Sequence, residues 1–306
     1  MKKIFEFSGF DQTPLYSVLW IPDCPAKLIL QISHGMTEHI ERYDQFAREL
    51  NSHGILVAGY DLRGHGHNPV NPSCCSLGEG NWKKSLEDMR LFHRFLDSRF
   101  PNLPHVLLGF SLGSFLVREY LEKDSSVSGA VLMGTGDQPG WVLTFLKSLV
   151  QGQIRKHGFD QTTPLVKKLS FETYNLKFSP AETPCDWMSS DKTEVRRYRN
   201  DPLCQTDISS GLFWQLLTSM HHTGKLSSFE SWNKQLPVLL LSGDKDPVGD
   251  LGKGIQRILK KMNKSGISSV KMHLIPGCRH DLLHEFENGG TKKAIHILIS
   301  FLLDLT

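Results

Sequence analysis

Ser111 is the residue of this sequence whose type and setting point most directly to chemistry. It stands at the centre of a Gly-x-Ser-x-Gly pentapeptide, residues 109–113. The apolar residues 106–108 before the pentapeptide are typical of a strand, and residues 115–120 after it favour a helix. A sharp turn between strand and helix holds the central serine in a strained backbone conformation that exposes its hydroxyl, and flanking glycines permit the reversal. We therefore predict that Ser111 is an exposed nucleophile.

A serine hydroxyl needs an imidazole to take its proton and a carboxylate to orient that imidazole. After a serine in such a turn, the acid and then the histidine are expected further along the chain. Three aspartates, Asp244, Asp246 and Asp250, follow the apolar run 238–241. We favour Asp246, because Asp244 is closer to the strand end and is expected to bond turn amides. The predicted base is His280, in the loop after the last strand.

The transition state also requires amide donors that point at the developing oxyanion. One predicted donor is the backbone N–H of Leu112, directly after the nucleophile, and the other is that of Met36, in the loop after the first parallel strand. We expect His34, in the same loop, to shape the loop without a catalytic role. Two histidines near the predicted base, His273 and His284, are also interpreted as structural.

A second group of histidines raises the question of a metal site. The segment 61–68 contains His-x-His, and two more histidines precede it in the sequence. A di-metal hydrolase would need further ligands directly afterwards, which Asn68 and Pro69 do not supply, so we predict no metal. Instead, we expect Asp61 and Arg63 to fix this loop by hydrogen bonds.

Short apolar runs alternate with helical patterns along most of the chain, which predicts a mostly parallel sheet flanked by helices. Residues 3–8 and 15–21 are expected to open the sheet as an antiparallel pair. The remaining strands are predicted at 28–33, 55–60, 106–108, 127–133, 238–241 and 270–275, and helices at 43–52, 82–100, 115–120, 251–262 and 291–303.

The alternation stops between residues 134 and 235. Only helical patches occur there, at 141–150, 164–170, 192–199 and 210–220. Ligands bind beyond the carboxyl ends of parallel strands, so an insertion that leaves such an end is expected to cover the site as a lid. We therefore predict a core formed by residues 1–134 and 236–306 and a helical cap formed by residues 135–235.

Length and composition indicate one large α/β enzyme domain. The chain has 306 residues, of which 39% are hydrophobic and 22% charged, and a formal net charge of +3 that gives no reason to expect nucleic acid as a partner. Neither a secretory signal nor an apolar run of membrane-spanning length is found. The six cysteines are scattered, which favours reduced thiols and a cytoplasmic location.

Several motifs follow one another in the order of a known family. They are His34-Gly35-Met36-x-Glu38-His39, x-Arg42-Tyr43, Asp61-x-Arg63-Gly64-His65-Gly66, Gly109-Phe110-Ser111-Leu112-Gly113, Gly243-x-x-Asp246 and Gly277-x-x-His280. The chain resembles the monoacylglycerol lipase and lysophospholipase branch of the α/β-hydrolases, a group also called serine aminopeptidase-like. The resemblance implies the α/β-hydrolase fold, the triad Ser111, Asp246 and His280, and an oxyanion hole formed by the Met36 and Leu112 amides.

Two departures from the family pattern bear on specificity. Met36 stands where many relatives have a smaller residue, and Asp281 follows the base where glutamate is common. Neither removes a catalytic atom, but both leave the preferred acyl-chain length open.

The expected activity is that of a serine esterase that needs no cofactor. Its substrate would be a monoacylglycerol, a lysophospholipid or a similar acyl ester, cleaved through an acyl-enzyme. One alternative is a serine aminopeptidase or amidase with the same triad. Another is a ligand-binding homologue without turnover, against which the intact Ser, Asp and His argue.

The cap region adds three expectations. One apolar patch is formed by Trp141, Val142, Leu143, Phe145, Leu146 and Leu149. We expect it either to receive an acyl chain or touch a membrane surface transiently, or else only to pack the cap onto the core. A second apolar set is expected to pack: Phe213, Trp214, Leu216 and Leu217. A third set is expected to be a solvated edge with one anchor, and an aminopeptidase would need an acidic pair there: Asp186, Trp187, Asp191 and Glu194.

Overall fold

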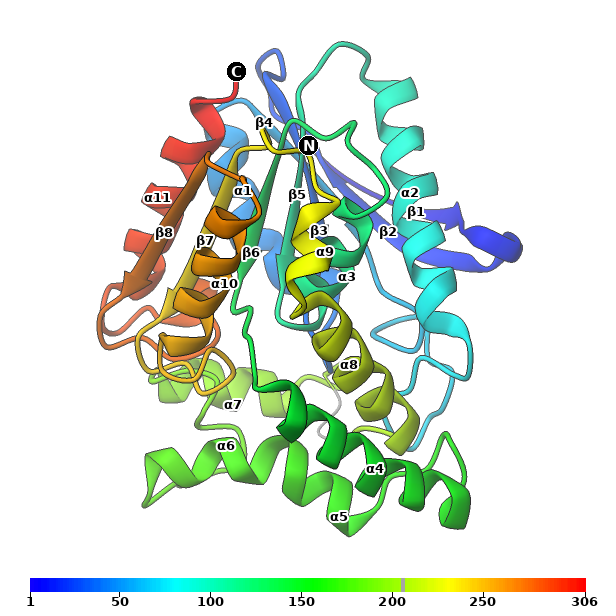
Figure 1. Ribbon diagram of the computed structural model, residues 1–306. Coiled ribbons are helices and arrows are strands. Elements are labelled where there is room, and N and C mark those ends of the chain that lie inside the picture. Colours follow the sequence, from blue (N-terminus) through cyan, green and yellow to red (C-terminus); the bar gives the residue numbers. More distant parts are fainter. Residues whose placement is uncertain (205–206) are drawn as a thin grey trace.

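The computed structural model describes residues 1–204 and 207–306, and in this part of the chain eight strands form one sheet (Figure 1). The strand order is β1-β2-β4-β3-β5-β6-β7-β8; β2 is antiparallel to β1 and β4, and the neighbours from β4 to β8 are parallel. The strands are β1 (Lys2–Ser8), β2 (Pro14–Trp20), β3 (Leu28–Ser33), β4 (Ile55–Tyr60), β5 (His105–Phe110), β6 (Gly129–Met133), β7 (Val238–Gly243) and β8 (Val270–Ile275).

The central strands are buried on both faces, which is why their sequences are continuous apolar runs and not alternating ones. One face packs against α2 (Asn81–Arg99), α3 (Leu112–Leu121) and α10 (Lys253–Lys264). The other packs against α1 (Asp44–Ser52) and α11 (Gly290–Leu303). The predicted mostly parallel sheet with helices on both faces is confirmed.

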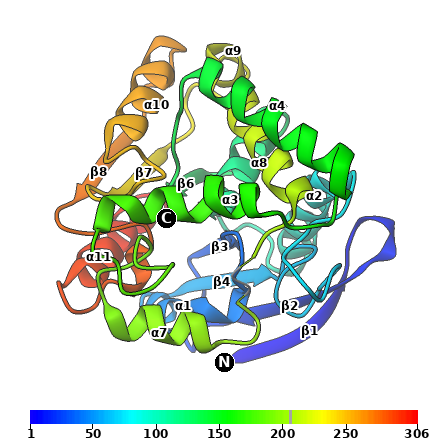
Figure 2. The same cartoon turned by 90° about the horizontal axis from the view of Figure 1, so that it is seen from below.

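Helices alone occupy the chain between β6 and β7, apart from a single bridge pair at Ile208, in the residues that the structure describes. Figures 1 and 2 show α4 to α7 across the end of the sheet at which the parallel strands finish. These elements are α4 (Gly140–His157), α5 (Pro164–Lys167), a π turn (Lys168–Glu172), α6 (Thr173–Asn175), α7 (Lys192–Asn200), α8 (Ser210–Thr223) and α9 (Leu226–Glu230). The four predicted helical patches are therefore helical, and the first extends to His157.

The packing prediction for α8 is also confirmed, because Phe213, Leu216 and Leu217 are buried in the core cluster and Trp214 packs against it partly buried. None of the described helices is both long enough and apolar enough to cross a bilayer.

Candidate active site

Ser111 lies in the turn between β5 and α3, with φ 50° and ψ −117°. Such a conformation costs a residue other than glycine about 1–3 kcal/mol. The surrounding packing enforces it: a Cβ at Gly109 would lie 2.5 Å from the carbonyl oxygen of Gly113, and one at Gly113 would lie 2.0 Å from that of Ser33. Helix α3 therefore begins in direct contact with the strand ends, and Ser111 stands at that edge.

The imidazole of His280 is paired with the carboxylate of Asp246. His280 Nδ1 lies 2.9 Å from Asp246 Oδ1, and both side chains are buried. The Val248 amide donates to the same oxygen and the Ser242 hydroxyl to the other, which orients the carboxylate. With the Nδ1 proton directed at Asp246, Nε2 is the ring atom left to take a proton, and it has no hydrogen-bond partner in the described residues.

The three aspartates after β7 have different partners. Asp244 accepts a hydrogen bond from the Gly277 amide at 2.8 Å, as predicted for a turn-bonding aspartate. Asp250 accepts from the Arg257 guanidinium at 3.1 Å. Asp246 is thus the one of these three carboxylates that contacts His280.

Two contacts bring His280 next to the Ser111 turn. The ring of Phe110, the residue before Ser111, lies 4.9 Å from the His280 ring between centroids. The Ser111 amide donates to the Met133 carbonyl, and the next residue, Gly134, lies so close to His280 that a Cβ there would be 2.9 Å from its Cε1. The histidine therefore borders the serine turn from the β5 and β6 sides.

The predicted oxyanion donors also lie at this strand end. Leu112 is the first residue of α3, so its N–H has no acceptor within the helix and lies at the positive end of the helix dipole. The loop of Met36 follows β3 and adjoins the turn, because a Cβ at Gly35 would lie 2.9 Å from the Phe110 ring. The Met36 amide has no acceptor among the described residues.

An ion-pair network that the sequence analysis missed links the loops of Met36 and His280. The Arg42 guanidinium pairs with Glu38 and, at 2.9 Å, with Asp281; all three side chains are at most 8% exposed. Glu38 also accepts from the Gly35 amide at 2.6 Å. Burial alone would raise the pKa of Asp281, but His284 and Arg42 lower it overall. The sequence offered one signal of this network, the spacing of four residues between Glu38 and Arg42. That spacing does not indicate Asp281, the third member of the network.

His284 and His273 differ in their surroundings. His284 Nδ1 lies 2.9 Å from Asp281 Oδ1, so it bonds locally as predicted. His273 lies within β8 as predicted, with its side chain exposed.

Cys278, two residues before the predicted base, is fully buried, and burial raises the pKa of its thiol to about 11.

The expectation of a solvated edge with one anchor is wrong for Asp191 and Glu194, which are buried, whereas the buried Trp187 fits the expected anchor. Trp187 is 5% exposed, and its ring lies 5.1 Å from that of His280 between centroids. The nearby Asp191 is buried because its carboxylate caps α7, accepting from the Thr193 and Glu194 amides. The sequence did not predict the burial of Asp191, because an aspartate that caps a helix looks the same in a sequence as one in a solvated stretch. Trp187 therefore belongs to the segment between β6 and β7 and contacts the predicted base.

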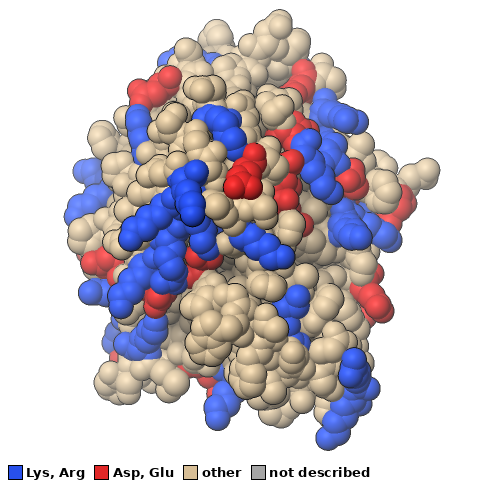
Figure 3. All heavy atoms as spheres, viewed as in Figure 1, with Lys and Arg blue, Asp and Glu red and all other residues tan. Residues whose placement is uncertain are grey.

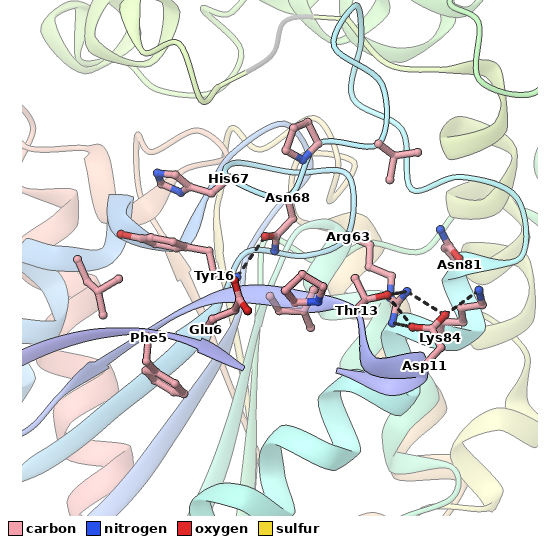
Figure 4. A pocket seen from close by; sticks show the side chains of 15 residues that line it. Phe5, Glu6, Asp11, Thr13, Tyr16, Arg63, His67, Asn68, Asn81 and Lys84 are labelled. Carbon is pink, nitrogen blue, oxygen red and sulfur yellow. Dashed lines mark hydrogen bonds and ion pairs between the residues drawn. The ribbon is translucent and has the colours of Figure 1, made fainter. Parts of the chain in front are cut away.

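The loop 61–68 is held as predicted. The Asp61 carboxylate accepts from the Ile40 and His67 amides. Arg63 donates to Asp88 and Asp11, as Figure 4 shows for Asp11. The groove drawn in Figure 4, about 710 Å³, lies beside β1 and β2, and the predicted triad is not part of its lining.

The comparisons with known proteins agree over most of the chain. A protein-family model described as serine aminopeptidase, S33, matches residues 25–287. The monoglyceride lipase of Homo sapiens is 28% identical over 92% of this chain and 84% of its own. A monoglyceride lipase homolog of monkeypox virus is 24% identical over 94% and 93%.

A solved structure of similar shape is a thermostable carboxyl esterase from Bacillus coagulans. It has a TM-score of 0.90 and 23% identity, and the match covers 99% of this chain and 98% of the esterase. The likeness confirms the α/β-hydrolase fold.

Proposed function

Because the chain belongs to the serine aminopeptidase S33 family of hydrolases, we propose that Ser111, His280 and Asp246 are a triad that cleaves carboxylic esters. The chain is a carboxylic ester hydrolase, since a monoglyceride lipase and a monoglyceride lipase homolog match more than 90% of it. The observation that carries the triad is the pairing of His280 Nδ1 with Asp246 beside the strained turn of the serine.

The proposed reaction begins when Ser111 Oγ attacks the ester carbonyl carbon and His280 Nε2 takes its proton. Asp246 holds the Nδ1 proton and stabilises the imidazolium that forms. The oxyanion accepts hydrogen bonds from the Met36 and Leu112 amides, each of which is worth about 3 kcal/mol in the transition state. The alcohol leaves with the proton of His280, and a water activated by the same nitrogen then releases the acid from the acyl-enzyme.

The charges near the site favour an ester over a peptide with a free amino terminus. An aminopeptidase would need an acidic pair to hold the substrate ammonium group. The Asp186 carboxylate bonds the Glu182 amide and the Thr183 hydroxyl, Asp191 caps α7, and Glu194 pairs with Arg197 at 2.6 Å. These carboxylates are already engaged within the cap.

We propose that residues 135–235 form the cap over this site and that its outer face contacts lipid. Trp141 and Phe145 lie one turn apart on α4 and are 76% and 59% exposed, whereas Leu143 is buried. The lower part of the face in Figure 3, over α4, is largely uncharged with basic side chains at its edge. Such a surface suits a substrate with an acyl chain, a monoacylglycerol or a lysophospholipid, and brief contact with a bilayer that carries it.

We also propose that the protein works in a reducing compartment such as the cytoplasm. All six cysteines are free thiols in the structure, and Cys24 is exposed. A disulfide-forming environment would endanger such a thiol.

A fluorophosphonate probe tests the nucleophile. Wild-type protein and the control Ser98→Ala, at an exposed serine, should be labelled, and Ser111→Ala should not be. Labelling that survives Ser111→Ala would contradict the assignment. Hydrolysis of p-nitrophenyl esters of increasing chain length should exceed that of aminoacyl nitroanilides; faster nitroaniline release would favour the aminopeptidase alternative.

A further inference from the structure

A cluster of two histidines and an aspartate lies at the end of the sheet opposite Ser111. His93 and Asp97 are four residues apart on α2, and His105 is the first residue of β5. Ser111 follows the other end of β5, six residues away, or about 20 Å at the rise of a strand. The cluster therefore lies outside the proposed active site.

The three side chains converge. His105 Nδ1 lies 2.7 Å from Asp97 Oδ1, and His93 Nε2 lies 3.2 Å from Asp97 Oδ2. The two imidazole rings are 4.0 Å apart between centroids, and one ligand atom from each of the three residues lies within 4.8 Å of the others. Both histidines are buried, while Asp97 is 47% exposed, so an ion has a path from solvent to the cluster.

The hydrogen bonds around His93 leave a lone pair on Nε2. The Tyr120 hydroxyl donates to the Asp124 carboxylate at 2.9 Å, so its oxygen is the acceptor for His93 Nδ1–H at 2.6 Å. The Nε2 lone pair therefore faces Asp97, and no described residue forms a hydrogen bond with that nitrogen.

The same reasoning applies to His105. The Gln31 amide nitrogen donates to the Met89 carbonyl at 3.2 Å, which turns its oxygen toward His105 Nε2 at 3.1 Å. Nε2 is then the ring nitrogen that donates to Gln31, which leaves Nδ1, beside the Asp97 carboxylate, as the atom that can bind an ion. One nitrogen of each ring and the carboxylate therefore meet at one point, an arrangement that a shared cation would stabilise.

From this convergence we propose that His93 Nε2, His105 Nδ1 and the Asp97 carboxylate bind a divalent transition-metal ion of the Zn²⁺ class. Two imidazoles and a carboxylate are a common Zn²⁺ ligand set, with water as the fourth ligand. Ring nitrogens that bind metal usually have the opposite N–H held by an outer partner, as Tyr120 and Gln31 hold these. The ion would join the end of α2 to the start of β5 and stabilise the fold.

Another group, His39, Asp201 and Cys204, also brings three possible ligand atoms together. Burial raises the pKa of the Cys204 thiol well above its usual value, which opposes the thiolate that a metal needs. The group of His39, Asp201 and Cys204 therefore serves as the control in the experiment below.

Cobalt absorption spectroscopy on the chelator-treated full chain tests the proposal. Wild type should bind one equivalent of Co²⁺ with the visible bands of a tetrahedral site and no thiolate charge-transfer band, and Zn²⁺ should displace it and raise the melting temperature. Asp97→Asn, at a half-exposed side chain, should weaken binding by at least about 100-fold, and Tyr120→Phe by about 10–100-fold. The matched controls Glu87→Gln, on the same helix, and Asp201→Asn should bind as wild type does.

Any of four results would overturn the site. Absence of Co²⁺ and Zn²⁺ binding by the folded wild type would mean that a proton on His105 Nδ1, and not a metal, joins this histidine to Asp97. Binding that survives Asp97→Asn, or that is lost in Asp201→Asn, would assign the metal elsewhere. If Asp97→Asn did not fold, His105→Gln would be measured, and binding retained by that variant would refute the ligand set.

Discussion

Replacing Arg42 by methionine should destabilise the protein severely, because it leaves two buried carboxylates without their cation. Glu38 and Asp281 are 3% and 4% exposed in their side chains, and Arg42 is 8% exposed. Removing one partner of a buried, hydrogen-bonded ion pair costs about 3–5 kcal/mol. Since about 1.4 kcal/mol corresponds to a factor of ten, the equilibrium constant of unfolding should rise by about two to three and a half orders of magnitude.

The chain offers a matched control at Arg48. Arg48 also pairs with an acid four residues earlier, Asp44, but its side chain is 67% exposed. Arg48→Met should therefore change the free energy of unfolding little, since solvent screens such pairs. Urea unfolding at pH 7, followed by tryptophan fluorescence, gives both values under the same conditions.

A third variant separates the loss of the cation from the loss of packing. Combining Glu38→Gln and Asp281→Asn with Arg42→Met removes both stranded charges, so it should recover a large part of the lost stability. The reasoning is refuted if Arg42→Met lies within about 1 kcal/mol of Arg48→Met, or if the triple variant is less stable than Arg42→Met alone.

Three further predictions concern the site and the pH dependence of stability. Gly134→Ala places a Cβ 2.9 Å from His280 Cε1 at a φ of 60°, so ester hydrolysis should fall at least about 10-fold in kcat while probe labelling slows in parallel. Asp246→Asn should lower kcat by about 10⁴-fold, and Asp244→Asn should leave it near wild type; equal losses would contradict the assigned acid. Burial lowers the pKa of His65 to about 3, so the unfolded chain binds its proton first as pH falls below about 6.5. Between pH 7 and 5 this costs about 2 kcal/mol of stability, and in urea titrations His65→Asn should show a smaller loss by that amount.

The central strands were predictable because their signal is local. A strand buried on both faces must be apolar throughout, and the helix after it must present an apolar stripe, so the sequences of β3, β5 and β7 mark their own positions. The order of the proposed serine, acid and base along the chain is the order of the strand ends that they follow. These parts of the prediction needed no knowledge of distant contacts.

The choice among the aspartates after β7 was predictable for a related reason. Asp244 stands at the strand end, where turn amides are the nearest donors, and it bonds the amide of Gly277. Asp246 is two residues farther on and reaches His280. The distance of each aspartate from the strand end therefore indicates which of the two, Asp244 or Asp246, pairs with His280.

The network around Arg42 and the contact of Trp187 with His280 were not predictable, because the partners are far apart in the sequence. Asp281 is 239 residues from Arg42, and no local pattern marks such a pair. Asp191 stands in a polar segment that resembles a solvated edge. Its carboxylate nevertheless accepts hydrogen bonds from the first amides of α7 and is buried. Burial of a polar residue depends on the partner it finds, which single-sequence reasoning does not supply.

With the proposed triad and cap, the contact of Trp187 with His280 makes catalysis depend on the cap. The Trp187 ring lies 5.1 Å from the His280 ring, tilted by 37°, and stacks on the Phe171 ring at 5.7 Å. It therefore joins the loop of the proposed base to the helical segment after β6. A change of cap packing that shifts Trp187 must therefore alter the surroundings of His280, whose orientation the reaction requires. Substrate choice in the cap and proton transfer at the base are then coupled through one side chain, so cap substitutions that reshape the acyl site should change kcat as well as KM.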